Sequence, residues 1–333
     1  MTSQIHDDAE SAQPDQPLQA RVPMELGGSR LDKVIAELFP QYSRSRLQGW
    51  LKEERVLVNG VAAAKGNQKV QGMDRIALSP GVLAHMQALI PEDMGLDIVA
   101  RTQEYTVVNK QAGLVVHPAP GHWTGTLMNG LYHLDPELIH VPRAGIVHRL
   151  DADTTGLMVV ARSLEAHQSL VAQLQDKSLF RQYEAIAVGV MTGGGKVDAP
   201  MGRHPVDRKK QAVVKTGGKN AVTHYRVLDR YRAHTRIKVQ LETGRTHQIR
   251  VHMAHRNYPL VGDPLYGGRL KQPAGASEAL REALRRFPRQ ALHARKLGLI
   301  HPATGEYCEF EAPLPEDMQG LIQVLEEDAN SQS

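Results

Sequence analysis

The chain has 333 residues, of which 41% are hydrophobic and 23% are charged, enough for about two globular domains with a substantial core. No segment approaches the ~18 consecutive apolar residues of a membrane span, and the N-terminus lacks the basic start and apolar core of a secretion signal. The single cysteine, Cys308, excludes an intramolecular disulfide framework. We therefore expect a cytoplasmic protein without a membrane partner.

Positive charge is concentrated in residues 30–80. The formal net charge is +4. Residues 1–29 hold five acidic and one basic residue, whereas residues 30–80 hold nine basic and five acidic residues, a local excess of +4. A surface that binds a polyanion needs such a concentration. Residues 1–21 are mostly polar and rich in Gln, Asp, Ser and Pro, which predicts a disordered tail.

Residues 22–80 have the pattern of a small α+β domain. Apolar residues within 31–38 follow the i, i+3, i+4, i+7 spacing of an amphipathic helix, which Pro40 ends. Ser43 can cap a second helix over residues 43–54. Apolar side chains of this helix point inward and leave three basic residues on the other side, Arg44, Arg46 and Lys52.

After these helices, Asn59-Gly60 between β-type residues indicates a hairpin, and residues 74–78 are typical of a last strand. Two short helices, a hairpin and clustered basic residues can bind phosphate groups, and the stretch resembles the S4-type RNA-binding domain. The plainer interpretation is a small domain with a solvated basic face. Residues 81–96 are irregular and contain Gly and Pro, which predicts a linker.

Residues 97–325 consist of short β-rich runs with three intervening helical stretches, at 164–177, near 247–255 and at 277–287. This pattern predicts one mixed α+β domain built on a large, mainly antiparallel sheet. A second tail is expected over residues 326–333.

A cluster of polar and charged residues separates two apolar runs, 145–147 and 157–161, that we predict to be buried strands. Burying a charge costs several kcal/mol unless it is paired, so the cluster is either a satisfied ion pair or a working site. We expect its histidine to be structural and its threonines to cap the turn. The cluster comprises His148, Arg149, Asp151, Asp153, Thr154 and Thr155.

Two further segments supply groups that complement this cluster. Tyr183 lies in an alternating run at 180–189, and Arg250 lies on the helix that follows the turn at Gly244. Taken singly, a tyrosine on a strand is usually a core residue, and an arginine on a helix is usually exposed. Together with Asp151 they supply a carboxylate, a phenol and a guanidinium, and a carboxylate in a partly dry cleft needs a cation to remain ionised.

Other motifs give weaker signals. His247, His252 and His255 are spaced five and three residues apart without nearby cysteine or acidic ligands. We therefore predict no metal site and expect these histidines to bond to phosphate, backbone or solvent. The Gly-rich segment 193–196 lacks the spacing of a phosphate-binding loop and is predicted to be a hairpin turn. Cys308 is expected to be packed and inert.

The segment HRLD followed by DTTGL resembles the signature of the pseudouridine synthases that modify ribosomal and transfer RNA. Further motifs occur in the order and spacing of that family, and with the S4-type module the resemblance covers about residues 22–325. The motifs are GLVVHPAPG (113–121), GIVHRLDADTTGLMVVA (145–161), RQYEAIAVG (181–189), LETGRTHQIRVHMAHRNYPLVGDPLYGG (241–268) and QALHARKLGLIHPATG (290–305).

The resemblance implies isomerisation of uridine to pseudouridine in RNA, without a cofactor. It implies that Asp151 is the catalytic carboxylate, and two roles stay open for it: attack on C1′ or removal of the C2′ proton. Arg250 matches the arginine that pairs with this aspartate. Tyr183 matches the tyrosine that stacks on the target base and can help to move the C5 proton. The uracil must leave its stack, and the matching arginine, Arg149, either fills the vacated space or holds the RNA near the flipped nucleotide. The plainer interpretation of Arg149 is a simple phosphate contact.

Similarity to members that act on the large subunit implies 23S ribosomal RNA or its precursor as the partner, with target uridines in the stem-loop called helix 69. The basic run 203–211 is expected to contact RNA backbone, unless it is only a solvated loop. The residues concerned are Arg203, Lys209 and Lys210.

One departure from the family pattern is Ala152, where the family often has Lys, so we assign no catalytic role to this position. We expect a monomer. The alternative hypothesis is a non-catalytic RNA-binding or ribosome-assembly factor, which predicts loss of Asp151, Tyr183 or Arg250. All three residues are present.

Overall fold

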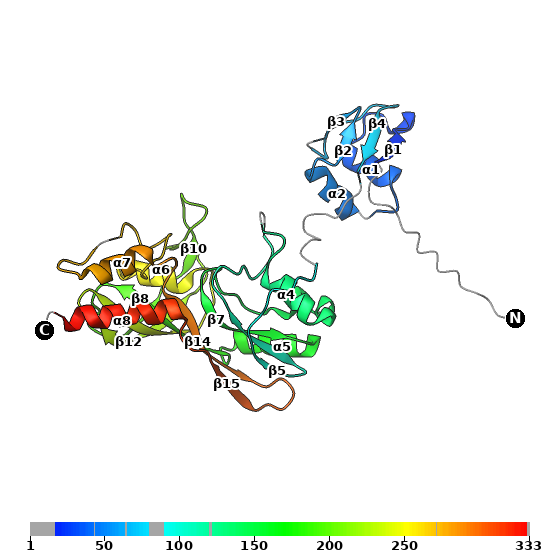
Figure 1. The fold of residues 1–333 in the computed structure, drawn as a ribbon. Helices are drawn as coiled ribbons and strands as arrows, with labels where there is room; N and C mark the ends of the chain where they lie inside the picture. Colours follow the sequence, from blue (N-terminus) through cyan, green and yellow to red (C-terminus); the bar gives the residue numbers. More distant parts are fainter. Residues whose placement is uncertain are drawn as a thin grey trace. The chain divides into compact units, whose positions relative to one another are not determined.

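The computed structural model describes residues 17–42, 44–63, 65–79, 90–119, 122–270 and 272–331. The chain divides into two compact units, residues 1–87 and 88–333 (Figure 1). Among the described residues, no helix is long and apolar enough to cross a membrane.

The smaller unit is a four-stranded antiparallel sheet, in the order β1-β4-β2-β3, packed against two helices. Both predicted helices are confirmed, and their apolar faces pack around Trp50, whose side chain is fully buried. The elements are β1 (Leu18–Arg21), η1 (Met24–Leu26), α1 (Leu31–Leu38), α2 (Arg44–Lys52), β2 (Val56–Val58), β3 (Val61–Ala62) and β4 (Arg75–Leu78).

The predicted hairpin joins β2 to β3. Asn59 and Gly60 at its turn have φ angles of 53° and 84°, the left-handed conformation at both central positions that a tight hairpin requires. The side chain of Asn59 donates to Asp74 and accepts from the backbone N–H of Arg75, which ties the turn to β4. The Asn-Gly pair predicts this turn because few other residues adopt that backbone conformation without strain.

The predicted start of this domain, residue 22, is too late. Leu18–Arg21 form β1, which pairs antiparallel with β4, because Leu18 and Ala20 pack against the core. Residues 1–16 of the predicted tail and the helix cap at Ser43 lie outside the described residues.

The predicted linker also needs correction at its C-terminal end. Residues 90–96 belong to the larger unit, because the N–H of Glu92 donates to the carbonyl of Asn129 and the side chains of Met94 and Leu96 pack against the core. Residues 80–89 lie outside the described part of the chain.

The larger unit is built on a nine-stranded sheet in the order β5-β6-β7-β14-β8-β13-β12-β9, with β15 paired to β14 beside that path (Figure 1). β7 and β14 run parallel, and the other neighbours are antiparallel, which confirms the predicted mixed sheet. Its strands are β5 (Ile98–Arg101), β6 (Tyr105–Lys110), β7 (Thr155–Ala161), β8 (Phe180–Val188), β9 (Gly195–Asp198), β12 (Val222–Arg230), β13 (His234–Leu241), β14 (Leu292–Ile300) and β15 (Tyr307–Glu311); a separate hairpin contains β10 (Met201–Arg203) and β11 (Gln211–Val213).

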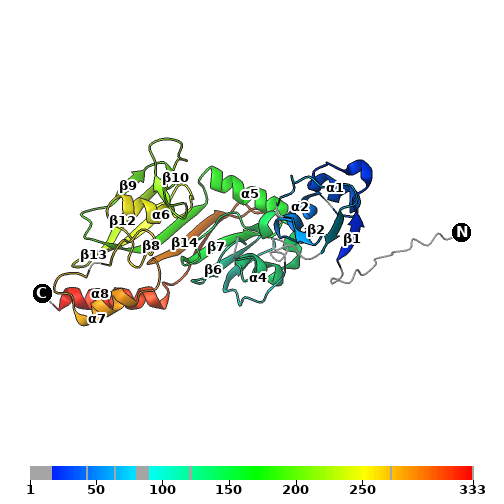
Figure 2. The same ribbon diagram turned by 90° about the horizontal axis from the view of Figure 1, so that it is seen from above.

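Helices cover both faces of this sheet. The main core cluster lies between one face and two helices, α4 (Leu127–Leu134) and α6 (Gln248–His255). The other face is covered by α5 (Leu164–Gln175) over one half, and by α7 (Glu278–Arg286) and α8 (Glu316–Asn330) over the other. Both views show α7 and α8 side by side (Figures 1 and 2). Two short 3-10 helices complete the unit, η2 (Pro136–His140) and η3 (Pro142–Gly145).

The predicted end of this domain at residue 325 is wrong. The helix α8 continues to Asn330, so most of the predicted tail 326–333 is helical. Its buried apolar residues recur at helical spacing and stop at the predicted boundary, which explains the error: Met318, Leu321, Ile322 and Leu325.

Two further predictions of local structure are wrong. The run 145–147 is not a strand, because Arg143, Ala144 and Gly145 have φ angles of 55°, 53° and 77°, which turn the chain into η3. Ile146 then makes a single bridge to the sheet. The segment 193–196 is not a hairpin turn, because β8 pairs with β13 and β14 whereas β9 pairs with β12.

The sheet has a seam between β7 and β14, which we define by the residue pairs Thr155–His293 and Gly156–Ala294. Gly156 has a φ of 110°, and a Cβ at this position would lie 2.3 Å from the carbonyl oxygen of Ala294. Glycine is therefore required for the two strands to approach so closely. The seam joins the half made of β5, β6 and β7 to the half that begins with β14, and the turn before β7 carries Asp151.

Candidate active site

Asp151 lies on the tight turn between η3 and β7, next to the seam. Its backbone carbonyl accepts a hydrogen bond from the N–H of Thr154 at 3.0 Å, which closes the turn. The hydroxyl of Thr154 accepts from the side chain of Gln290 at 3.0 Å, and the hydroxyl of Thr155 lies 2.8 Å from Nδ1 of His293. The two threonines therefore hold the turn against the other half of the sheet.

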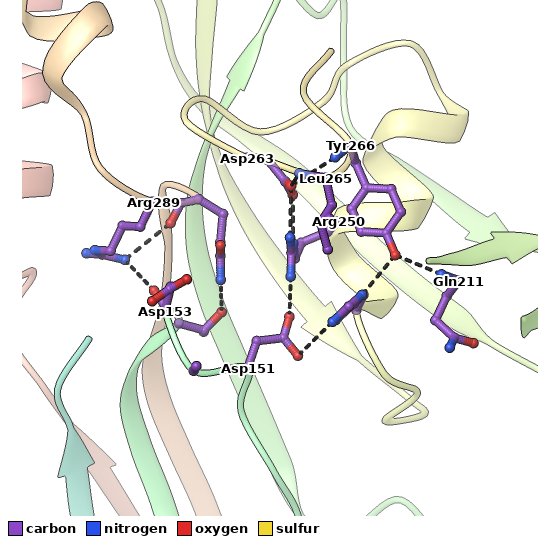
Figure 3. A network of polar contacts seen from close by, with 12 residues as sticks. Asp151, Asp153, Gln211, Arg250, Asp263, Leu265, Tyr266 and Arg289 are labelled. Carbon is purple, nitrogen blue, oxygen red and sulfur yellow. Dashed lines mark hydrogen bonds and ion pairs between the residues drawn. The ribbon is translucent and has the colours of Figure 1, made fainter. Parts of the chain in front are cut away.

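Arg250 pairs with Asp151 across the seam (Figure 3). It lies in α6 with 4% of its surface exposed, and its Nη1 donates to Asp151 Oδ2 at 2.9 Å. Its Nε and Nη2 donate to the two carboxylate oxygens of Asp263 at 2.7 and 2.8 Å. Burial opposes the charge, but the hydrogen bonds and charges of the two carboxylates prevail and raise the pKa of Arg250, so it stays a cation.

Asp263 is part of this network, although the sequence analysis did not single it out. It is 4% exposed, and its Oδ1 also accepts the backbone N–H groups of Leu265 and Tyr266 at 2.9 and 3.0 Å. Burial acts to raise the pKa of Asp263, but the Arg250 guanidinium and these N–H groups hold that pKa below its usual range. Asp263 thus fixes the guanidinium so that one nitrogen faces Asp151. The signal in the sequence is an aspartate between Gly and Pro in GDPLYGG.

A chain of polar contacts through Tyr266 and His247 leads toward the other carboxylate oxygen of Asp151 (Figure 3). The hydroxyl of Tyr266 accepts from the backbone N–H of Gln211 at 2.9 Å and lies 2.8 Å from Nδ1 of His247. Burial lowers the pKa of His247, so its ring is neutral. The other ring nitrogen of His247, Nε2, lies 3.8 Å from Asp151 Oδ1.

A buried lysine fixes the backbone beside Asp151. The Nζ of Lys110, at the end of β6, donates to the carbonyls of Gln111, Leu114 and Ala152 at 2.8, 2.9 and 2.5 Å. Burial lowers the pKa of Lys110 to about 8. The sequence analysis did not identify Lys110, because it is the last residue of an otherwise apolar strand. Only the folded structure places its Nζ next to the carbonyl of Ala152.

A second buried cation, Arg289, holds the same turn from the other half of the sheet. Its Nη1 donates to the carbonyl of Asp153 at 3.1 Å (Figure 3). Its Nε and Nη2 form a two-point ion pair with Asp317 at 2.6 and 2.8 Å. The backbone on both sides of Asp151 is therefore tied down, at Ala152 and at Asp153.

Asp151 faces a cavity of about 320 Å³. Tyr183 and Arg250 line the same cavity, so the structure brings together the three residues that the sequence predicts to act together. Tyr183 is 5% exposed, and burial raises its pKa, so its phenol is protonated at neutral pH. Asp151 is the one carboxylate in the described lining, against five arginines, which suits an anionic ligand. The arginines are Arg143, Arg149, Arg181, Arg245 and Arg250.

The predicted RNA-binding residues lie in three places. Arg149 is exposed at the wall of the cavity. Arg203 and Lys209 are exposed on the hairpin of β10 and β11, where Lys210 forms an ion pair with Asp207 at 3.8 Å. The others lie on α2: Arg44 and Lys52, which are exposed, and Arg46, whose side chain lies outside the described atoms.

The other histidines that the sequence analysis singled out, His148, His252 and His255, have structural partners or face solvent. His148 accepts a hydrogen bond from the N–H of Val159 at 3.1 Å, and burial lowers the pKa of His148 to about 3. His252 bonds to Thr223 and to a backbone carbonyl, and His255 is exposed. Within the part of the chain that the structure describes, no three His, Cys, Asp or Glu side chains are grouped to hold a metal ion.

Comparison with known proteins identifies the class to which this fold and site belong. A family model described as RNA pseudouridylate synthase matches residues 104–255, and a model of the S4 domain matches residues 29–76. The solved structure of human RNA pseudouridylate synthase domain containing 4 matches with a TM-score of 0.54 and 26% identity, over 69% of this chain and 93% of that one. Human RNA pseudouridylate synthase domain containing 1, which is 23% identical with a TM-score of 0.51, shares the fold over 71% of this chain and 96% of its own.

Relatives extend the match to most of the chain. The ribosomal large subunit pseudouridine synthase D of Pseudomonas aeruginosa is 57% identical over 309 residues, which are 93% of this chain and 96% of that protein. The protein of the same name from Escherichia coli K12 is 52% identical over 301 residues, or 90% and 92% of the two chains. The chain therefore belongs to the RNA pseudouridylate synthase family. It is a pseudouridine synthase with an N-terminal S4 domain, and the resemblance carried by its motifs is confirmed.

Proposed function

We propose that this protein converts specific uridines to pseudouridine in 23S ribosomal RNA, within the stem-loop called helix 69, and that Asp151 is its catalytic carboxylate. The observation that carries the proposal is the pairing of Asp151 with the buried Arg250 at 2.9 Å, in a cavity whose other charged residues are all basic among those described. The names of the relatives support ribosomal RNA of the large subunit as the substrate.

The reaction rearranges atoms that are already present in the nucleotide. The bond from N1 of uracil to C1′ breaks, the base rotates, and C5 bonds to C1′, with loss of a proton from C5 and gain of one at N1. The carboxylate of Asp151 either attacks C1′ or removes the C2′ proton. Arg250 holds Oδ2, whereas the neutral ring of His247 lies 3.8 Å from Oδ1, beyond hydrogen-bond distance. We therefore assign Oδ1 as the oxygen that faces the ribose.

Tyr183 and Arg149 serve the base that has left its stack. Stacking on an aromatic ring is worth ~1–3 kcal/mol per base, which offsets part of the few kcal/mol that flipping costs. We assign this stacking to Tyr183, whose protonated phenol lies on the cavity wall. Arg149 is exposed on the same wall and holds the RNA beside the flipped nucleotide.

The remaining contacts position the RNA through its phosphates. We propose that the enzyme acts as a cytoplasmic monomer and binds 23S ribosomal RNA or its precursor. A role confined to RNA binding or ribosome assembly is disfavoured, because Asp151, Tyr183 and Arg250 are all retained and line one cavity. The proposed phosphate contacts are Arg44, Arg46 and Lys52 of the S4 domain and Arg203, Lys209 and Lys210 of the β10–β11 hairpin.

The test maps pseudouridines in 23S RNA from a strain that lacks its own enzyme and carries this chain, Asp151→Asn or Asp198→Asn. Asp198 is the matched control, since its side chain is 55% exposed on β9. We expect the unmodified chain and the control to restore pseudouridine in helix 69, and Asp151→Asn to restore none. Restoration at another loop would contradict the substrate assignment, and restoration by Asp151→Asn would contradict the catalytic one. If no version restores the modification, the binding-only alternative is favoured.

A further inference from the structure

Three arginines of the described residues are buried, and one of them has no partner. Arg250 and Arg289 are paired with carboxylates at distances of 2.6–2.9 Å. Arg181 is 6% exposed, yet none of the described carboxylates lies within ion-pair distance of it, and its Nε is buried without a hydrogen-bond partner. A buried cation without a counter-charge is unfavourable in the free protein. The presence of such a cation therefore points to a partner that arrives from outside.

Arg181 lies beside the catalytic groups. It precedes Tyr183 by two residues on β8, so the two side chains project from the same face of the strand. Both line the cavity that contains Asp151. Gly244, in the turn before α6, leaves the space that the guanidinium occupies, because a Cβ at that position would lie 2.8 Å from Nη1 of Arg181.

We infer that Arg181 binds a phosphate group of the RNA next to the target uridine, inside the catalytic cavity. The inference rests on the proposed function, because it takes RNA as the ligand of the cavity. RNA carries a phosphate at every nucleotide, and a guanidinium binds phosphate through two parallel N–H···O bonds. Asp151 does not supply the counter-charge, because its close contacts with basic side chains are with Arg250 and His247 and its carboxylate lies beyond ion-pair distance of Arg181. A base carbonyl would satisfy N–H groups but leave the buried charge uncompensated.

Burial gives Arg181 a role that the exposed arginines of the wall do not have. Arg143 and Arg149 are exposed, so they meet phosphates that run along the surface. Arg181 meets a phosphate only when the nucleotide has entered the cavity. Its contact therefore stabilises the flipped nucleotide relative to the stacked one, which makes Arg181 a substrate-binding residue for the step that precedes bond breaking.

The first experiment compares the thermal unfolding of Arg181→Met with that of Arg289→Met, a matched buried arginine that has a carboxylate partner. We expect Arg289→Met to lower Tm, because it leaves the carboxylate of Asp317 without its guanidinium partner. We expect Arg181→Met to leave Tm unchanged or raise it, because it removes an unpaired buried charge. A fall in Tm equal to that of Arg289→Met would overturn the inference, since it would reveal a stabilising partner within the protein.

The second experiment measures binding and turnover on an unmodified transcript of 23S ribosomal RNA, with Arg181→Met and Arg181→Lys. We expect Arg181→Met to weaken binding about tenfold or more and to reduce the slope of log affinity against log salt by about 1. Arg181→Lys should keep the slope and recover part of the affinity, because the charge remains but the planar fork is lost.

The outcomes separate the inference from the proposed function. A weaker affinity with an unchanged salt slope would overturn phosphate as the ligand, and unchanged affinity and turnover would overturn any contact of Arg181 with the substrate. Pseudouridine formation by the unmodified protein is scored on the same transcript. Its absence would refute the proposed function, while the salt slope would still decide for or against a phosphate at Arg181.

Discussion

Replacing Asp263 with asparagine should release Arg250 from its anchor. Both oxygens of Asp263 accept from the guanidinium, at 2.7 and 2.8 Å, and Oδ1 also accepts two backbone N–H groups. Asparagine has the same shape but offers one acceptor oxygen and an amide NH2 group that would face the guanidinium donors. The buried cation of Arg250 would then have Asp151 as its single carboxylate partner among the described residues.

The expected loss of stability is large. Breaking a buried ion pair by removing one partner costs about 3–5 kcal/mol, and each kcal/mol shifts Tm by about 2–4 °C in a domain of this size, so Tm of the larger unit should fall by roughly 6–20 °C. Turnover on the RNA transcript should fall as well, because Arg250 no longer presents Nη1 to Asp151 in a fixed orientation.

The assay is thermal unfolding of the unmodified protein and of Asp263→Asn at about pH 7 and pH 3. Arg250 and the backbone N–H groups keep the pKa of Asp263 low in the folded state, against burial. The contribution of the pair is therefore complete above the unfolded value of about 4 and is lost as the pH falls through the lower folded value. The difference in Tm between the unmodified protein and Asp263→Asn should be largest at neutral pH and smaller at about pH 3. A difference below about 1 °C at neutral pH, equal to that of the exposed control Asp198→Asn, would refute the claim that Asp263 anchors Arg250.

Two further predictions concern acid and the seam. Burial lowers the pKa of His234 and of His293 to about 4 and the pKa of His148 to about 3, so these side chains are neutral when folded, whereas the unfolded chain binds protons below about pH 6.5. The free energy of unfolding should therefore be highest above about pH 6.5 and fall toward pH 4, by up to about 1.4 kcal/mol per pH unit for each histidine. Urea unfolding at about pH 7, 6 and 5 measures this free energy, and a value that does not change with pH would contradict the prediction. Gly156→Ala should lower Tm and turnover, because its Cβ would lie 2.3 Å from a backbone carbonyl at a φ of 110°. Gly305→Ala is its control, with a φ of 75° and open space around the Cβ, and equal effects of the two changes would show that the close approach of the strands is unimportant.

The smaller unit is the part of the fold that the sequence predicts best, because residues close together in the sequence determine most of its helices and turns. The spacing of apolar residues over 31–38 and the pair Asn59-Gly60 act within one helix or one turn. The strand β1 was not predicted, because the sequence of Leu18–Arg21 has no local pattern that clearly distinguishes it from the polar tail before it. Its structure comes from pairing with β4, far along the chain.

In the larger unit, motifs predicted the three residues to which we assign the reaction, but they did not predict the residues that hold these three in place. Asp151, Tyr183 and Arg250 stand in recognisable segments, and they line one cavity. Lys110 and Asp263 act through tertiary contacts to a turn and to a guanidinium, and the segments that contain them give no sign of these partners.

For Arg181, the sequence predicts the face of the strand on which the side chain lies, but not whether the side chain has a partner. The period of two along β8 places Arg181 on the face of Tyr183, and this much follows from the sequence. Among the described residues, no carboxylate lies within ion-pair distance of Arg181, and only the folded structure reveals this. The prediction of a strand at 145–147 fails for a similar reason. Positive φ angles at Arg143, Ala144 and Gly145 turn the chain there, and the apolar composition of the run does not reveal them.

Main-chain pairing at the seam is confined to two residue pairs, and the residues proposed to be catalytic lie on opposite sides of it. Asp151 belongs to the block that contains β7, whereas Tyr183 and Arg250 belong to the block that contains β8 and α6. Local opening of a structure requires less free energy than global unfolding, and short pairings open first. Amide protons at this joint should therefore exchange with solvent before those inside either block. If the joint opens first, activity on heating should be lost below the temperature at which the strands and helices melt.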